Sequence, residues 1–169
     1  MDVEAKRVKD SSVVMAQVMI PQDANPMGNI HGGVIMKLID TAGGVVAFRH
    51  ARMNVVTASI DRLDFHNPVF IGDLLFLKAS VNLVGRTSME IGVRVEAENL
   101  ITGEVRHTAS AYLTYVALDK NGRPALVPGL ILETEDEKRR NREAKKRRDM
   151  RLAERRSEED CRSDPNACR

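Results

Sequence analysis

The sequence predicts an α+β domain in which a curved antiparallel sheet wraps around one long helix. An amphipathic helix pattern runs from about residue 33 to about residue 52, and a single strand-like segment precedes it. Four segments of alternating apolar residues follow the helix and are joined by short turns. Short turns connect antiparallel neighbours, whereas parallel strands need long crossovers. We therefore expect about five to six antiparallel strands layered on one central helix.

The first predicted strand, residues 12–20, is short, rich in Val, Ile and Met, and ends at a proline. The loop after it, residues 21–29, is dense in Pro, Asn, Asp and Gly, which form turns and tolerate unusual backbone angles. It leads through His31 to Gly32 and Gly33, where the helix pattern begins. This abrupt change from turn residues to an apolar periodic pattern marks the junction as the candidate functional region.

The predicted helix carries one apolar stripe, because its apolar residues recur at three- and four-residue spacing. The first turn of a helix has unpaired N–H groups and a partial positive charge, and glycines there allow another group to approach closely. Gly32 and Gly33 therefore predict a cradle for an oxyanion or a polarised carbonyl. Later in the helix, Gly43 and Gly44 predict close packing against a sheet or another helix. The stripe consists of Val34, Ile35, Leu38, Ile39, Ala42, Val45 and Val46.

Asp40 lies off this apolar stripe, about two helical turns after the glycine pair. The common role of an aspartate on an arbitrary helix is a solvated carboxylate, here paired with Lys37 or Arg49. The glycine-rich entry to the same helix favours a role in chemistry instead. The residues leave both interpretations open.

Four predicted strands follow the helix. The first, residues 55–65, places Thr57 and Ser59 on one polar face if its side chains alternate regularly. The others alternate apolar and polar residues, as one-sided strands do. They cover residues 74–84, 88–100 and 104–118, separated by turn sequences at 66–68, 85–86, 99–103 and 119–124.

Charge divides the chain into a domain at residues 1–132 and a C-terminal tail at residues 133–169. The domain carries 13 basic and 13 acidic residues, whereas the much shorter tail carries 13 and 11. The tail is interpreted as a solvated helix with i,i+4 ion pairs, or as disorder. Its basic run, Lys145 to Arg148, is surrounded by acids that nearly cancel its field, so nucleic-acid binding is not expected.

Composition excludes several other classes. Aromatic residues make up only 4% of the chain and Trp is absent, so no platform for stacking bases is expected. No apolar run approaches the roughly 20 residues that cross a bilayer, and the charged N-terminus lacks a signal-peptide region, so we expect a cytoplasmic protein. Histidine spacing predicts no metal site. Cys161 and Cys168 fit either a short disulfide loop or two reduced thiols, and their role is open.

Several short motifs, in this order and spacing, are similar to one known family over about residues 13–128. Any one of them is weak, but together they resemble the hotdog-fold acyl-CoA thioesterases, specifically the cytosolic acyl-CoA hydrolases. The resemblance implies a hotdog fold, in agreement with the periodicity. The motifs are DAN at 23–25, GNIHGG at 28–33, MKLID at 36–40, VTASID at 56–61, DFHNPV at 64–69, GD at 72–73 and GRTSME at 85–90.

The resemblance also implies roles for individual residues. The family uses an amide or acid in the loop and an acid on the central helix, which two subunits contribute to one site; these match Asn25 and Asp40. Asp40 would be the general base or the nucleophile, and Asn25 would orient the thioester or water. His31, Gly32 and Gly33 would bind the thioester and its oxyanion, the two glycines through their backbone N–H groups. His31 is also interpreted as a helix-entry residue that hydrogen-bonds the loop.

The substrate contacts are the remaining implied residues. By resemblance, Thr57 and Ser59 line the acyl tunnel, while Arg86, Thr87 and Ser88 contact the CoA phosphates and pantetheine. The alternative for these five is ordinary strand polar residues and a hairpin-turn arginine.

The function implied by the resemblance is hydrolysis of fatty acyl-CoA to free fatty acid and CoA, with no resident cofactor. Because one helix covers only part of such a sheet, we expect at least a homodimer, and the family precedent is a hexamer built as a trimer of dimers. The alternative function is a non-catalytic hotdog sensor that binds acyl-CoA and reports its level to a partner. The pairing of Asn25 with Asp40 favours the enzyme, since a sensor needs no base beside the thioester.

Overall fold

The structure, a computed structural model, describes residues 4–163. Its main sheet has five antiparallel strands in the order β2-β4-β5-β6-β3. The strand alternation and short turns therefore predicted this α+β architecture correctly. The strands are β2 (Val13–Val18), β3 (Asn54–Phe65), β4 (Asp73–Val84), β5 (Ser88–Asn99) and β6 (Val105–Leu118).

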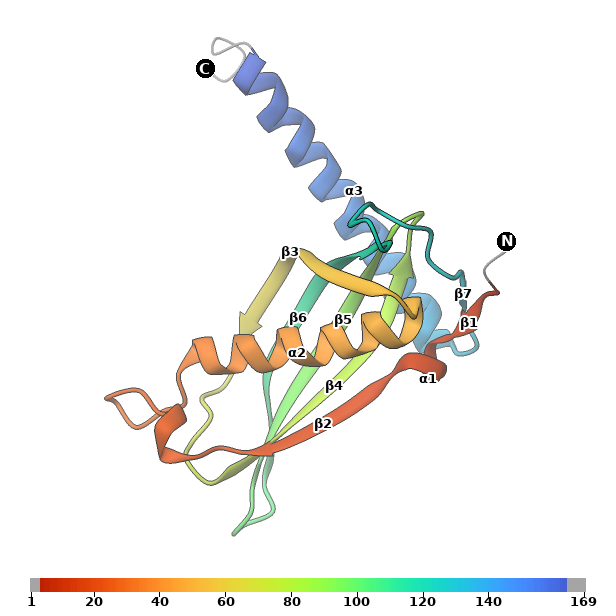
Figure 1. Cartoon of the computed structure of the whole chain (residues 1–169). Helices are drawn as coiled ribbons and strands as arrows, with labels where there is room; N and C mark the ends of the chain where they lie inside the picture. Colours follow the sequence, from red (N-terminus) through yellow and green to blue (C-terminus); the bar gives the residue numbers. More distant parts are fainter. Residues whose placement is uncertain (1–3, 164–169) are drawn as a thin grey trace.

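The central helix, α2 (Gly32–Ala51), lies across one face of this sheet, and the strands curve around it (Figure 1). The core between them is buried and mostly aliphatic, as the scarcity of aromatic residues requires. Its largest contributors include Ile35, Ile39 and Val46 from α2 and Leu75, Leu77, Ile91 and Leu113 from the strands. The predicted stripe is confirmed except at Val45, which is 39% exposed.

Both ends of α2 are capped. His31 is the N-cap residue, and its ring nitrogen accepts a hydrogen bond from Gly33 N. At the other end, Arg52 adopts a left-handed conformation with φ of 56°, and the Lys6 ammonium donates to His50 O at 2.7 Å. Such contacts satisfy backbone groups that helix ends leave unpaired.

Three short elements near the chain start and a second small sheet have no counterpart among the predicted elements. Two-residue strands carry no periodicity, so they exist only because distant segments pair. The elements are β1 (Lys6–Arg7), α1 (Val8–Ser11), the 3-10 turn η1 (Pro21–Asp23) and β7 (Leu130–Ile131), with β1 and β7 pairing in parallel.

Strand β3 does not alternate regularly. Its pairing with β6 shifts between Thr57 and Ser59, and again between Ile60 and Arg62. An extra residue in one strand of a pair reverses the faces of the side chains beyond it. The expectation that Thr57 and Ser59 share a face is therefore wrong, because a bulge lies between them.

The tail forms a second long helix, α3 (Glu135–Ser163), on the sheet face opposite α2 (Figure 1). It is not solvated all round, since Asn141 and Ala144 are buried. Arg147 forms an ion pair with Glu90 at 2.7 Å, in which Glu90 is only 4% exposed. Arg151 forms an ion pair with Asp61. The sequence did not predict this packing, because α3 has few apolar residues and polar contacts with the sheet hold it.

The distal part of α3 extends away from the sheet (Figure 1), and residues 152–160 are exposed. Among the described helices, none is both long and apolar enough to cross a membrane. Cys168 lies outside the described residues.

Candidate active site

Asp40 lies in the middle of α2 and is held by two side chains from the sheet. Thr57 on β3 donates its hydroxyl to Asp40 Oδ1 at 2.6 Å. Tyr115 on β6 donates its hydroxyl to Asp40 O at 2.9 Å and is 3.2 Å from Oδ1. Neither Lys37 nor Arg49 is a partner: Arg49 donates to the backbone carbonyls of Ser12 and Asp10. The solvated ion pair considered for Asp40 is therefore absent from the described residues.

Tyr115 was not among the site residues predicted from the sequence. It occupies an inward position of a strand, which by itself indicates only a core residue. The available signal was the Gly43–Gly44 pair, which predicted close packing of the helix. Gly43 is the point of contact, since a Cβ atom there would lie 2.5 Å from the Tyr115 hydroxyl.

Asn25 shapes the loop that precedes α2. Its side-chain Oδ1 accepts hydrogen bonds from Met27 N at 2.9 Å and Asn29 N at 3.3 Å, and its backbone N–H donates to Asn29 O at 2.7 Å. With the carbonyl oxygen occupied by the loop, the amide nitrogen is the group with donors to offer a ligand. Asn25 and Gly32 line one cavity of about 290 Å³.

The two glycines at the start of α2 differ in whether their backbone N–H already has an acceptor. Gly33 N donates to His31 Nδ1 at 3.0 Å, and His31 N donates to Asp23 O at 2.8 Å. The interpretation of His31 as a helix-entry residue bonded to the loop is confirmed by these contacts. Gly32 is the first residue of α2, so helix geometry leaves its N–H without an internal acceptor. Of the two glycines, Gly32 is the one with a free donor position in this arrangement.

Within one chain, the structure separates Asn25 from Asp40. Asp40 follows Gly32 by eight positions along α2, which is about 12 Å at 1.5 Å per residue. The cavity beside Asn25 is closed by the far end of β3, at Phe65 and His66, rather than by Asp40. One protomer thus carries two separate groups of predicted site residues.

Arg86, Thr87 and Ser88 form the turn between β4 and β5. Backbone contacts fix this turn, because Arg86 O accepts from Val127 N at 3.2 Å and Thr87 O accepts from Ala117 N at 3.0 Å. Ser88 pairs with Val116, one position from the level at which Tyr115 pairs with Thr57. The turn therefore lies near the Asp40 end of the sheet, and the Arg86 side chain is exposed.

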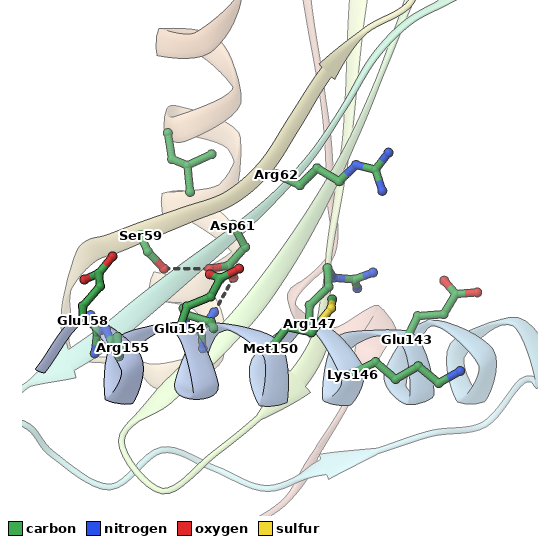
Figure 2. A pocket seen from close by; sticks show the side chains of 12 residues that line it. Ser59, Asp61, Arg62, Glu143, Lys146, Arg147, Met150, Glu154, Arg155 and Glu158 are labelled. Atoms are coloured by element: carbon green, nitrogen blue, oxygen red, sulfur yellow. Dashed lines mark hydrogen bonds and ion pairs between the residues drawn. The ribbon is translucent and has the colours of Figure 1, made fainter. Parts of the chain in front are cut away.

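Ser59 lies on the other face of the sheet from Asp40. Its hydroxyl donates to Asp61 Oδ1 at 2.9 Å, as Figure 2 shows. Ser59 lines a cavity of about 560 Å³ between β3 and α3, which contains neither Asp40 nor Asn25. Although this cavity is larger than the one beside Asn25, charged α3 side chains line it, so its size does not identify a thioester site.

Among the described residues, no group of three or more His, Cys, Asp or Glu is arranged to hold a metal ion. The candidate site itself offers the Asp40 carboxylate, the Asn25 amide and the backbone N–H at the start of α2. These groups are suited to acid–base or nucleophilic attack on a carbonyl with stabilisation of an oxyanion.

The curved antiparallel sheet wrapped around one central helix is a hotdog fold. Residues 27–104 match the family model of the thioesterase superfamily. The chain belongs to this superfamily. Its similarity to two relatives places it in the family of the acyl-CoA thioester hydrolases.

One relative is an uncharacterized acyl-CoA thioester hydrolase of Bacillus subtilis. It is 42% identical over 134 residues, which cover 79% of this chain and 78% of the relative. The other is the cytosolic acyl coenzyme A thioester hydrolase of Rattus norvegicus, 39% identical over 146 residues and 85% of this chain. The match spans only 38% of the length of the rat protein.

Solved structures extend the similarity to the tail. An apo-hexameric acyl-CoA thioesterase has a TM-score of 0.87 and 39% identity, covering 90% of this chain and 97% of its own. An acyl-CoA hydrolase from Staphylococcus aureus, in complex with butyryl coenzyme A and coenzyme A, has a TM-score of 0.87 and 34% identity. The match covers 94% of this chain and 97% of the hydrolase. Because the tail makes up more than a fifth of the chain, a match over 94% of it includes most of α3.

Three variants of the Staphylococcus aureus hydrolase have also been solved, in which an asparagine, an aspartate or a threonine is replaced by alanine. In that protein the asparagine precedes the aspartate by 15 positions, and the threonine follows the aspartate by 17.

Proposed function

We propose that this protein hydrolyses acyl-CoA thioesters to CoA and free fatty acid, at a site built from Asn25 of one copy and Asp40 of another. The observation that carries the proposal is the Asp40 carboxylate, which lies on α2 and accepts a hydrogen bond from Thr57 of β3. The N-terminus of the same helix offers a free N–H at Gly32. Asn25, Asp40 and Thr57 are separated by 15 and 17 positions, the spacing of the residues altered in the Staphylococcus aureus hydrolase.

The two-copy site is supported by the edge of the sheet. Strand β3 is an edge strand and exposes Val56, Ile60 and Phe65 by 42, 46 and 49%. An exposed apolar edge is a surface for pairing with another chain. If two β3 edges meet in antiparallel order, the Phe65 end of one lies beside the Asn54 end of the other. That arrangement brings Asn25 of one copy towards Asp40 of its partner, which no single chain achieves.

In the proposed reaction, Asp40 either removes a proton from water or attacks the thioester carbonyl itself. With water as nucleophile, the water oxygen bonds to the carbonyl carbon and the carbonyl oxygen becomes an oxyanion. Collapse of this intermediate breaks the carbon–sulfur bond, and the CoA thiolate leaves and takes up a proton. With Asp40 as nucleophile, a transient anhydride forms first and water hydrolyses it.

The oxyanion is stabilised by donors aimed at it before the reaction begins. Gly32 N–H and the Asn25 amide face the same cavity and supply such donors. Gly33 N–H contributes only if His31 releases it, because the His31 ring accepts that hydrogen bond.

The remaining parts of the proposal concern substrate and setting. Arg86, Thr87 and Ser88 bind the phosphates and pantetheine of CoA, and the acyl chain enters beside Thr57, while the role of Ser59 in the tunnel is carried by the resemblance alone. No resident cofactor is needed, because CoA is part of the substrate. The assembly is at least a dimer and, following the hexameric relative, a trimer of dimers. We place the protein in the cytoplasm, as the name of the rat relative indicates.

The test is thiol release from a panel of acyl-CoAs by the wild type and Asp40→Asn. The amide keeps the size of the side chain and removes its basicity, so we expect kcat to fall by at least about a hundredfold. Asn25→Ala should also lower kcat. Mixing the two variants should restore part of the wild-type activity, because in a mixed dimer the intact Asn25 of one copy meets the intact Asp40 of the other. Unchanged turnover in Asp40→Asn would exclude Asp40 as base or nucleophile.

A non-catalytic acyl-CoA sensor is separated from the enzyme by the same measurements. A sensor would bind acyl-CoA without releasing thiol in the wild type.

A further inference from the structure

Tyr115 is the most deeply buried polar group in contact with the candidate site. Its residue is only 2% exposed, and it pairs with Thr57 on β3 and with Met89 on β5. From this fixed position its hydroxyl reaches α2 and donates to the backbone and side chain of Asp40. A buried strand tyrosine has little rotational freedom, so its hydroxyl is a fixed reference point for a carboxylate on the helix.

The two donors approach the same carboxylate oxygen. Thr57 lies 2.6 Å and Tyr115 lies 3.2 Å from Asp40 Oδ1. Among the described residues, no hydrogen bond reaches Asp40 Oδ2. Because Asp40 is otherwise exposed, these contacts select one orientation of a side chain that would sample several. The selected orientation holds Oδ1 against the protein and leaves Oδ2 for a substrate or water.

Gly43 provides the space for this contact. A Cβ atom at Gly43 would lie 2.5 Å from the Tyr115 hydroxyl and 3.1 Å from two of its ring carbons. At the neighbouring Gly44, the nearest Tyr115 atom would be 3.9 Å away, an ordinary contact. Alanine is favoured over glycine in a helix, so the glycine at position 43 is explained by the approach of the ring.

We propose that Tyr115 is a positioning residue that orients the Asp40 carboxylate for hydrolysis, and that Gly43 is required because it lets the Tyr115 hydroxyl reach Asp40. This inference rests on the proposed function, since Tyr115 affects the proposed reaction only through its contact with Asp40. It adds Tyr115 and Gly43 to the residues on which turnover depends.

The direction of the effect follows from the donor role of the phenol. Burial, and then the neighbouring charge of Asp40, raise the pKa of Tyr115, so it stays protonated and donates throughout the neutral range. A hydrogen bond from a fixed donor to a carboxylate has a defined geometry and therefore orients the group that accepts it. Loss of the donor lowers the correctly oriented fraction of Asp40, and kcat falls with it.

The experiment compares Tyr115→Phe, Gly43→Ala and Gly44→Ala with the wild type, using steady-state thiol release between pH 5 and 9. We expect kcat of Tyr115→Phe to fall about ten- to hundredfold, the range for one hydrogen bond to a charged group, with KM little changed. Gly43→Ala should show the same loss of kcat with KM little changed. Gly44→Ala is the matched control and should retain wild-type kcat.

Crystal structures of the same variants give a readout that does not need activity. The Asp40 side chain should leave its wild-type orientation in Tyr115→Phe and Gly43→Ala, and keep it in Gly44→Ala. The positioning role is refuted if Tyr115→Phe retains kcat and the Asp40 orientation while Asp40→Asn is inactive. If Tyr115→Phe does not fold, Gly43→Ala decides, because it keeps the tyrosine. An inactive wild type would instead refute the proposed function, and the crystal structures would still test the orientation of Asp40.

Discussion

Helices α2 and α3 pack on opposite faces of one sheet, but different interactions hold them. On the inner face, α2 buries aliphatic side chains such as Ile35, Ile39 and Val46. On the outer face, α3 is attached through Asn141, Arg147 and Arg151, which bond to polar groups of the sheet. The sheet thus presents an apolar surface to one helix and a hydrogen-bonding surface to the other.

The difference shows what each helix is able to carry. Apolar contacts are non-directional, so α2 tolerates a carboxylate at its margin provided that Thr57 and Tyr115 satisfy it. On the outer face each buried polar group needs its own partner, because an unpaired buried charge is costly. The carboxylate proposed to react, Asp40, therefore lies on the helix fixed by apolar packing, and the helix fixed by paired charges supports the outer face of the sheet.

The largest expected effect on stability is at the outer face. Arg147→Met leaves Glu90 buried without its cation, and we expect the free energy of unfolding to fall by about 3–5 kcal/mol. The double variant Arg147→Met with Glu90→Gln removes both charges and should recover most of this loss, because paired replacement of a buried ion pair is often near neutral. Urea unfolding of the three proteins measures both values. A loss below about 1 kcal/mol in the single variant would show that α3 is held by something other than this pair.

An intermediate effect, on the dependence of stability on pH, is expected at the inner helix. Burial lowers the pKa of His50; its hydrogen bond with Pro128 O opposes this shift, and the Lys6 ammonium adds to it. The unfolded chain therefore binds a proton below about pH 6.5 that the folded protein does not. Stability falls as the pH drops from there towards the folded pKa, by up to about 1.4 kcal/mol per pH unit.

His50→Gln tests this source of acid sensitivity, because an amide can still donate to Pro128 O but does not titrate. Thermal unfolding between pH 5 and 8 should show a smaller fall in stability for the variant than for the wild type. Equal slopes for the two proteins would exclude His50 as the titrating group.

The smallest effect is expected where α3 leaves the sheet. A chain that ends after Leu152 keeps Asn141, Arg147 and Arg151, and it removes a stretch in which residues 153–160 are exposed. We expect its stability to stay within about 0.5 kcal/mol of the wild type, as for surface changes in general, and its kcat to be unchanged. A change in molar mass by light scattering would contradict this expectation, since it would place the distal part of α3 in the assembly.

Periodicity in the sequence predicted the strands of the main sheet and the central helix to within two residues. Side-chain patterns with periods of 2 and 3.6 are local properties that long elements display over their whole length. The junction of loop and helix was likewise legible, because turn residues and glycines act through local backbone conformation. Asn25, His31, Gly32 and Asp40 were named from that stretch and from the resemblance of its motifs.

The sequence alone thus determined the five strands of the main sheet, the central helix, their order and the candidate loop and helix of the site. Only the tertiary structure decided that a bulge turns Ser59 away from Thr57, that Tyr115 reaches Asp40 past Gly43, and that charged α3 packs on the sheet. These features depend on pairs of residues far apart in the chain, such as Asp40 with Tyr115 and Glu90 with Arg147. Such pairs leave no local pattern, because the contact exists only once the chain has folded.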